Sequence, residues 1–257
     1  MNTVYAKEIV TRIRAATRIL LVMHRRPDPD SIGSAAAMGE FLNLNGIAHN
    51  YYCVTSVPSD IQHFGIDQKD ILTSDTIKQA VYNFDLIITF DAGDLKHAGL
   101  DEIPRLRPAG FAQVDHKRPR PFMINFDHHA TNAQFGDLNI VEVVCASTTE
   151  LLYRFFEALR FPISARMSAY LLSGLLVDTD HFFNPATTAS SLEVAGAMMS
   201  KGVTLTELRQ FLFEQRGMKS LKLIGEVLSR LYRHPRYNIA ITYLTEEDIE
   251  RHGVSDQ

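Results

Sequence analysis

The feature that most constrains the fold is an apolar run at residues 19–23 that ends directly in a histidine and two aspartates. Five consecutive apolar residues are typical of a strand that is covered on both faces. Prolines restrict the backbone around His24, Asp28 and Asp30, and an Ala-rich helical stretch follows at residues 35–44. Open α/β sheets bind ligands between a strand end and a helix start, so this segment predicts a ligand site there.

Three further apolar segments end in the same residue types. They are residues 84–90 before Asp91, residues 122–126 before Asp127, His128 and His129, and the helical pattern 164–177 before Asp178. A lone aspartate after a strand is more often a cap or a turn residue than a ligand, but its recurrence at strand ends favours a ligand site. Adjacent side chains on an extended chain point apart, so one of the paired histidines can bind metal while the other faces substrate.

Together these segments supply the carboxylate and imidazole donors of a metal site, namely His24, Asp28, Asp30, Asp91, His128 and Asp178. Such donors suit manganese, magnesium, cobalt or zinc, according to geometry. Six are enough to hold two divalent ions about 3.5 to 4 Å apart with one bridging carboxylate. Two such ions polarise a phosphoryl oxygen and lower the pKa of a shared water, which favours phosphoester hydrolysis. The sequence contains no Gly-rich nucleotide loop, so phosphoryl transfer from ATP is the weaker interpretation.

Composition narrows the class of protein. The 257 residues suffice for one large domain or one and a half, and the net charge of -4 argues against a dedicated binder of long nucleic acid. The two cysteines, Cys53 and Cys145, are isolated, which predicts no disulfide framework and fits a reduced cytoplasm. We expect no membrane association, because no apolar run approaches the ~20 residues of a membrane helix.

A second type of signal is helix capping. Residues 147–150, Ser-Thr-Thr-Glu, match a capping box before a helix at residues 151–159, with each side chain reaching the other residue's backbone amide. Capping accounts for Ser147 completely, so contact of Ser147 or Thr148 with substrate is an additional hypothesis. Near the C-terminus, the pattern predicts an amphipathic helix at residues 218–232 and a strand at residues 237–243.

The four motifs, in this order, resemble those of the DHH-superfamily phosphoesterases, a group that includes RecJ-like exonucleases, nano-RNases and family II pyrophosphatases. The first motif is residues 24–34, the second is Asp91, the third is residues 127–129, and the fourth is Asp178 with Thr179. The resemblance covers residues 1 to about 235. Within the superfamily, residues 125–129, 135–139 and 146–150 most resemble the bacterial nano-RNase and 3′-phosphoadenosine 5′-phosphate phosphatase group.

The resemblance implies a role for each motif residue. His24, Asp28 and Asp91 would bind one ion, whereas Asp30, His128 and Asp178 would bind the second, with Asp91 bridging. Asp91 and His129 are the implied catalytic residues, with His129 facing the scissile phosphate, and Asp127 would orient His128. Relatives usually have glycine at the position of Asp180. The carboxylate of Asp180 could compete with the other donors for metal.

The resemblance also implies the domain organisation. We expect an α/β catalytic domain at residues 1–215, with a mostly parallel sheet flanked by helices. Residues 216–257 would be a linker helix and the incomplete start of a DHH-associated α/β domain, for which truncation, supply by another chain and a naturally minimal enzyme are all open. Truncation is the favoured explanation.

The expected function is metal-dependent hydrolysis of short oligoribonucleotides or nucleotide phosphates such as 3′-phosphoadenosine 5′-phosphate, with two Mn²⁺ ions, or Mg²⁺ or Co²⁺ in their place. A homodimer is compatible with this expectation. Cyclic di-AMP or linear dinucleotide phosphodiesterase activity is one alternative. A RecJ-type single-strand exonuclease is another, and the acidic net charge disfavours it. The non-enzymatic alternative is a module that binds nucleotides without hydrolysing them.

Overall fold

The structure is a computed structural model that describes residues 3–58, 61–103, 106, 120–204, 206–208 and 218–253. It divides into two compact units, Met1–Leu212 and Phe213–Gln257. The identity of the second unit as an incomplete DHH-associated domain stays a prediction.

The first unit is built on a six-stranded sheet in which every neighbouring pair is parallel. Its strands are β1 (Ile19–Met23), β2 (His49–Tyr52), β3 (Ile71–Leu72), β4 (Leu86–Phe90), β5 (Phe122–Asp127) and β6 (Leu138–Val141), in the spatial order β3-β2-β1-β4-β5-β6. All residues of β1 and β4 are buried, as the continuous apolar runs predicted. The strand order reverses between β1 and β4, which makes their carboxyl ends the topological switch point where such sheets bind ligands.

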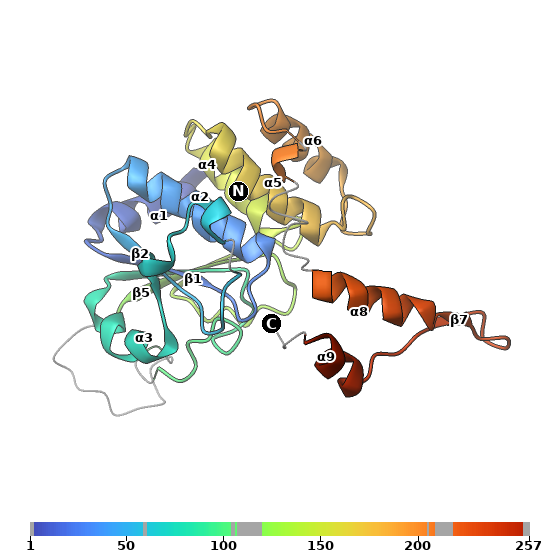
Figure 1. The fold of residues 1–257 in the computed structure, drawn as a ribbon. Helices are drawn as coiled ribbons and strands as arrows, with labels where there is room; N and C mark the ends of the chain where they lie inside the picture. Colours follow the sequence, from blue (N-terminus) through green and yellow to red (C-terminus); the bar gives the residue numbers. More distant parts are fainter. Residues whose placement is uncertain are drawn as a thin grey trace. The chain divides into compact units, whose positions relative to one another are not determined.

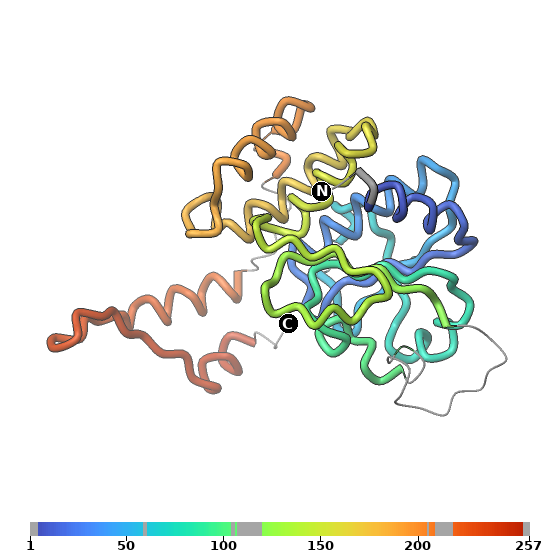
Figure 2. The backbone as a smooth tube through the Cα atoms, turned by 180° about the vertical axis from the view of Figure 1, so that it is seen from behind, coloured from blue at the N-terminus to red at the C-terminus, as the bar shows by residue number. Residues whose placement is uncertain are grey.

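Helices cover both faces of this sheet (Figure 1). The helices of the first unit include α1 (Thr3–Ala15), α2 (Pro29–Leu44), α3 (Ser74–Ala80), α4 (Thr148–Ala158), α5 (Ala165–Asp178) and α6 (Ala189–Met199), with short 3₁₀ helices at Ile61–Phe64, Gln68–Asp70 and Val81–Asn83. In Figures 1 and 2, α1, α2, α4 and α5 lie on one side of the sheet and α3 lies on the other. Alternate strand residues accordingly enter two cores, with Leu21 and Ile88 in the larger and Leu20 and Ile87 in the smaller.

Two glycines allow α2 and α5 to pack closely. A Cβ atom on Gly33 of α2 would lie 2.3 Å from the carbonyl oxygen of Tyr170 in α5, and one on Gly174 of α5 would lie 2.6 Å from Asp30 Oδ1. Only a residue without a side chain fits at either place. This packing brings the first two turns of α2 beside the middle and C-terminal turns of α5.

The prediction that the helix begins near residue 35 is wrong, because α2 begins at Pro29. Asp28 is its N-cap and accepts hydrogen bonds from the backbone amides of Asp30 and Ser31 at 3.0 and 3.1 Å. Proline is favoured at the first helical position, where its fixed φ is already helical and its missing amide is not needed. Asp30 therefore lies within the first turn of a helix rather than on a loop.

Of the two hydrogen bonds predicted for the capping box of α4, one forms as expected and the other has a different donor. The Ser147 hydroxyl accepts a hydrogen bond from the Glu150 amide at 3.0 Å, as predicted. The Glu150 carboxylate, however, accepts from the amide of Ala146 at 2.8 Å instead of from that of Ser147. It also pairs with Arg154 one helical turn later, at 2.7 Å.

The second unit contains α8 (Met218–Ser229), the antiparallel pair β7 (Tyr232–Arg233) and β8 (Ala240–Ile241), and α9 (Glu246–His252). The predicted helix to residue 232 was too long, and the predicted strand at residues 237–243 forms only the two-residue β8. Proline at position 235 cannot donate to a ladder or extend a helix, and the chain turns there, with the His234 amide bonded to Ile239 O. Across the described ranges, no helix has the length and apolarity needed to cross a bilayer.

Candidate metal centre

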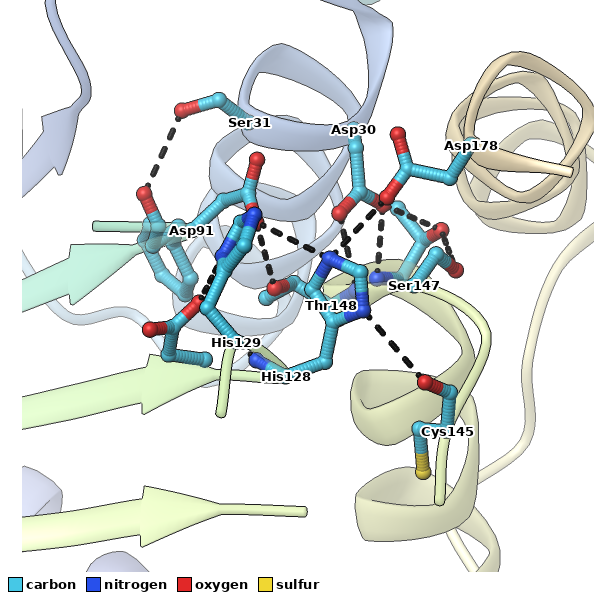
Figure 3. A network of polar contacts seen from close by, with 12 residues as sticks. Asp30, Ser31, Asp91, His128, His129, Cys145, Ser147, Thr148 and Asp178 are labelled. Carbon is cyan, nitrogen blue, oxygen red and sulfur yellow. Dashed lines mark hydrogen bonds and ion pairs between the residues drawn. The ribbon is translucent and has the colours of Figure 1, made fainter. Parts of the chain in front are cut away.

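Asp91 belongs to every group of carboxylates and imidazoles that could hold a metal ion in the described part of the chain, and Figure 3 shows several of these side chains around it. It directly follows β4 and has a left-handed backbone (φ 57°), held by a 2.9 Å hydrogen bond from its amide to Phe126 O. Its Oδ2 lies 3.4 Å from His24 Nε2, and its Oδ1 lies 3.5 Å from His128 Nε2. Asp91 Oδ1 also lies 3.5 Å from His129 Nδ1, so one carboxylate oxygen faces His24 and the other faces both His128 and His129.

The first group of donors comprises His24, Asp28 and Asp91, whose ligand atoms lie within 4.8 Å of one another. His24 Nδ1 lies 2.8 Å from the carbonyl oxygen of Arg25, and since a carbonyl only accepts, Nδ1 carries the proton and Nε2 is left for a metal. Asp28 Oδ1 lies 3.4 Å from this Nε2. Burial opposes the charged form of His24, but contacts with Asp28 and Asp91 outweigh it and raise its pKa to about 11 in the ion-free protein.

The second group comprises Asp30, Asp91, His128 and Asp178. The ring of His128 is held in the same way, with Nδ1 3.3 Å from the carbonyl oxygen of Cys145. Its Nε2 is buried, lies 3.1 Å from Asp178 Oδ2, and has no partner of hydrogen-bond geometry among the described residues. Burial opposes the charge on His128, yet the carboxylates of Asp178, Asp30 and Asp91 raise its pKa to about 10.

The N-terminus of α4 holds the fully buried Asp30. Its Oδ2 accepts from the Thr148 amide at 2.8 Å, and its Oδ1 accepts from the Thr149 amide at 2.9 Å and the Thr149 hydroxyl at 2.6 Å. The free amides of a helix N-terminus favour a carboxylate at this place. Even so, burial and the charges of Asp178 and Asp91 raise the pKa of Asp30 well above its usual value.

These features are chemically suited to divalent cations. Burial and the nearby Asp91 carboxylate also raise the pKa of Asp178, so the carboxylates of the second group repel one another in the ion-free protein. A bound cation would relieve this repulsion and would give His128 Nε2, which has no partner of hydrogen-bond geometry among the described residues, a ligand bond. Oxygen and imidazole donors of this kind are those that Mn²⁺, Mg²⁺ and Zn²⁺ accept in proteins.

Asp127 acts differently from the sequence prediction. We expected it to orient His128, but its Oδ1 lies 2.7 Å from Nδ1 of His129 and meets His128 only through the backbone amide, at 2.9 Å. The fully buried Asp127 also accepts from Asn132 Nδ2. The hydrogen bond to Asp127 raises the pKa of His129. The His129 ring is therefore held in place by Asp127 and favours its protonated form. Its side chain is 44% exposed to solvent.

The predicted substrate contacts by Ser147 and Thr148 gain no support, because both residues are fully buried. The Ser147 hydroxyl is engaged in the cap of α4, and the Thr148 hydroxyl donates to Asp91 Oδ1 at 3.0 Å. Thr148 therefore positions Asp91. The side chain of Asp180 is 78% exposed, so it lies outside the cluster of its neighbour Asp178.

Sequence reasoning missed three residues that hold the cluster. Thr149 binds Asp30, Asn132 binds Asp127, and the ring of His97 stacks on that of His24 with centroids 4.6 Å apart. The adjacent threonines after an N-cap serine could have been read as amide donors for an anion. We find no local signal that would have identified Asn132 or His97.

The chain is similar to several known proteins. It is 27% identical over 229 residues to the "bifunctional oligoribonuclease and PAP phosphatase NrnA" of Thermus thermophilus, covering 89% of this chain. It is 26% identical over 211 residues to a "probable manganese-dependent inorganic pyrophosphatase" of Streptococcus equi subsp. zooepidemicus, covering 80% of this chain. The chain spans only 64% and 60% of the lengths of these two relatives.

Its fold matches that of a solved "exopolyphosphatase-related protein" from Bacteroides fragilis with a TM-score of 0.81. The match covers 98% of this chain and 72% of that one at 23% identity. The sequence profile described as "DHH family, N-terminal domain" matches residues 18–175, which contain five of the six side chains of the two donor groups. The chain therefore belongs to the DHH family.

Proposed function

We propose that the chain is a metal-dependent phosphoesterase that hydrolyses short oligoribonucleotides or nucleotide phosphates such as 3′-phosphoadenosine 5′-phosphate. The observation that carries this proposal is the position of Asp91, whose two carboxylate oxygens face His24 Nε2 and His128 Nε2 at 3.4 and 3.5 Å. A carboxylate shared by two donor groups is the arrangement that a two-metal site requires. The name of the Thermus thermophilus relative supports the class of substrate.

In this proposal His24, Asp28 and Asp91 hold one ion, and Asp30, Asp91, His128 and Asp178 hold the other. Two divalent ions would polarise the phosphoryl oxygen and lower the pKa of a shared water. Mn²⁺ is our proposed metal, because it accepts both imidazole and carboxylate and because one relative is named as manganese-dependent. Mg²⁺ or Co²⁺ would suit the same donors.

The remaining residues of the site bind or position groups. His129, held at Nδ1 by Asp127, presents the rest of its ring to the exposed side of the cluster. Its raised pKa favours the imidazolium form, which would neutralise a phosphate oxygen or donate a proton to a leaving oxygen. Thr148 and Thr149 keep the carboxylates of Asp91 and Asp30 in place.

The test is hydrolysis of a dinucleotide and of 3′-phosphoadenosine 5′-phosphate with Mn²⁺, by wild-type protein and by Asp91→Asn. Asparagine tolerates the left-handed backbone of Asp91 and removes the bridging charge. Asp180→Asn is the matched control, because Asp180 also has a left-handed backbone (φ 47°) but is exposed. We expect Asp91→Asn to lose both activities and Asp180→Asn to keep them. Equal activity in all three proteins would refute the proposal.

The same assay separates the alternatives. Product from cyclic di-AMP or its linear dinucleotide alone would assign the chain to that phosphodiesterase class, and release of mononucleotides from long single strands would indicate a RecJ-type exonuclease. Nucleotide binding by calorimetry without product on long incubation would indicate a binding module.

A further inference from the structure

A cavity of about 440 Å³ lies at the carboxyl ends of β2 and β3, outside the donor groups described above. It is lined by residues 53–57, which follow β2, by residues 71–75, which run from β3 into α3, and by Gln68. A cavity of this size falls within the range of small-ligand sites in proteins.

The cavity shares a wall with the loop that carries the first donor group. In the pairing of β1 with β2, Val22 lies opposite Tyr52. His24 and Val54 each come two residues later, just past the ends of strands that lie about 4.8 Å apart. Two hydrogen bonds join the wall to the loop: Cys53 Sγ donates to His24 O at 3.3 Å, and Thr55 Oγ1 accepts from the Arg26 amide at 2.8 Å. The wall of the cavity is therefore bonded directly to the loop that carries the first donor group.

The lining suits an uncharged organic group better than a phosphate. Val54, Val57, Ile71 and Leu72 provide an apolar wall, and none of the described residues that line the cavity is lysine or arginine. Among the lining residues that the structure describes, the sole charged one is Asp75, which would repel a phosphate.

Three polar side chains at the cavity are free to bind such a group. They are Ser56, Gln68 and Asp75, which are exposed and make no side-chain hydrogen bond within the described part of the chain. An apolar wall faced by a few hydrogen-bonding groups is the usual lining of a small-molecule site, and a base with its sugar offers both kinds of surface.

We propose that this cavity binds the nucleoside next to the scissile phosphate, with the base against the apolar wall and Asp75 accepting a hydrogen bond from a ribose hydroxyl. The inference rests on the proposed function and deepens it. It explains how one metal centre would prefer a nucleotide to inorganic pyrophosphate, which has no group to fill an apolar cavity. Specificity is then set by residues 53–57 and 71–75, while the chemistry stays at the donor groups.

The experiment fills the cavity without altering a donor residue. Ser56→Trp places an indole in the cavity, and Ser200→Trp is the matched control, because Ser200 is an exposed serine at the end of α6. Each protein is assayed with Mn²⁺ on a dinucleotide and on bis(p-nitrophenyl) phosphate, which has no nucleoside. For Ser56→Trp we expect kcat/KM to fall about tenfold or more on the dinucleotide and to stay within about twofold on the other substrate. An equal fall on both substrates, or no fall on either, would overturn the inference.

A binding measurement keeps this test separate from the test of catalysis. Adenosine binding is measured by calorimetry with EDTA present, so the result does not depend on metal or on turnover. We expect binding to wild-type and Ser200→Trp, none to Ser56→Trp, and a several-fold weaker affinity for Asp75→Asn. If no substrate is hydrolysed but this binding pattern holds, the proposed function fails and the nucleoside site stands. If adenosine binds Ser56→Trp as tightly as wild-type, or binds none of the proteins, the nucleoside site is refuted.

Discussion

The close packing of α2 on α5 at Gly174 allows a sharp test of how the metal centre is assembled. A Cβ atom at this position would lie 2.7 Å from Asp30 Cα, which is 0.7 Å inside the 3.4 Å lower limit of ordinary contact. It would also lie 2.6 Å from both Asp30 Oδ1 and Thr149 Cγ2. Because Asp30 Cα is a backbone atom of a helix, Gly174→Ala must push α2 and α5 apart.

The change in unfolding free energy caused by Gly174→Ala follows from two opposing effects. Overpacking a core costs about 1–3 kcal/mol, whereas Gly→Ala in a helix interior gains about 0.5–1 kcal/mol. We expect Gly174→Ala to lose about 1–2 kcal/mol of unfolding free energy. A shift of 0.7 Å at Asp30 also exceeds the roughly 0.2 Å tolerance of metal–ligand distances, so Mn²⁺ affinity should fall about tenfold or more.

Gly196→Ala is the matched control, since Gly196 lies in α6 and a Cβ atom there would meet nothing within 4 Å. This variant should gain about 0.5–1 kcal/mol and leave Mn²⁺ affinity unchanged. Urea denaturation gives the stabilities and calorimetry gives the affinities. If Gly174→Ala matches Gly196→Ala in both, the account of how Asp30 is positioned is wrong.

Three further predictions concern charge and metal. Asp127→Asn should lower the pKa of His129 toward its usual value, measured by NMR titration of metal-free protein; an unchanged pKa would show that Asp127 does not hold this ring. Because the pKa values of His24 and His128 are raised to about 11 and 10 in the ion-free protein, both rings are charged at pH 7.5 and must lose a proton to bind metal. Mn²⁺ binding should therefore release about two protons, which calorimetry in buffers of different ionisation enthalpy measures. The Mn²⁺ affinity should rise from pH 6.5 to 9, and binding without proton release would contradict this prediction. Mn²⁺ at about 100 times its dissociation constant should stabilise the fold by about 2.7 kcal/mol per independent site, and EDTA should reverse this gain; a melting temperature indifferent to EDTA would argue against a native metal site.

The sequence predicted the positions of the donor residues because strand ends are visible in it. Continuous apolar runs identify β1 and β4 as strands covered on both faces, and parallel strands bring their carboxyl ends to one edge. His24 and Asp91 were therefore expected together, and the structure places their facing atoms 3.4 Å apart. Such an argument needs only local pattern and one rule of topology.

Other features depend on contacts between distant segments, which periodicity does not reveal. Asp127 was assigned to the wrong histidine because the turn after β5, closed by Asn132, decides which ring its carboxylate meets. Thr149 was overlooked because its role requires Asp30, 119 residues earlier, to lie at the N-terminus of α4. The early start of α2 was missed although Asp28 and Pro29 carry a clear capping signal, because the aspartate was interpreted as a ligand or a turn residue and not as a helix cap.

Anomalous diffraction from crystals of the protein grown with Mn²⁺ tests the central claim most directly. We predict two manganese peaks about 3.5 to 4 Å apart, one bonded to His24 Nε2 and the other to His128 Nε2, with a carboxylate oxygen of Asp91 bonded to each. A single peak, or two peaks that do not share Asp91, would contradict the account.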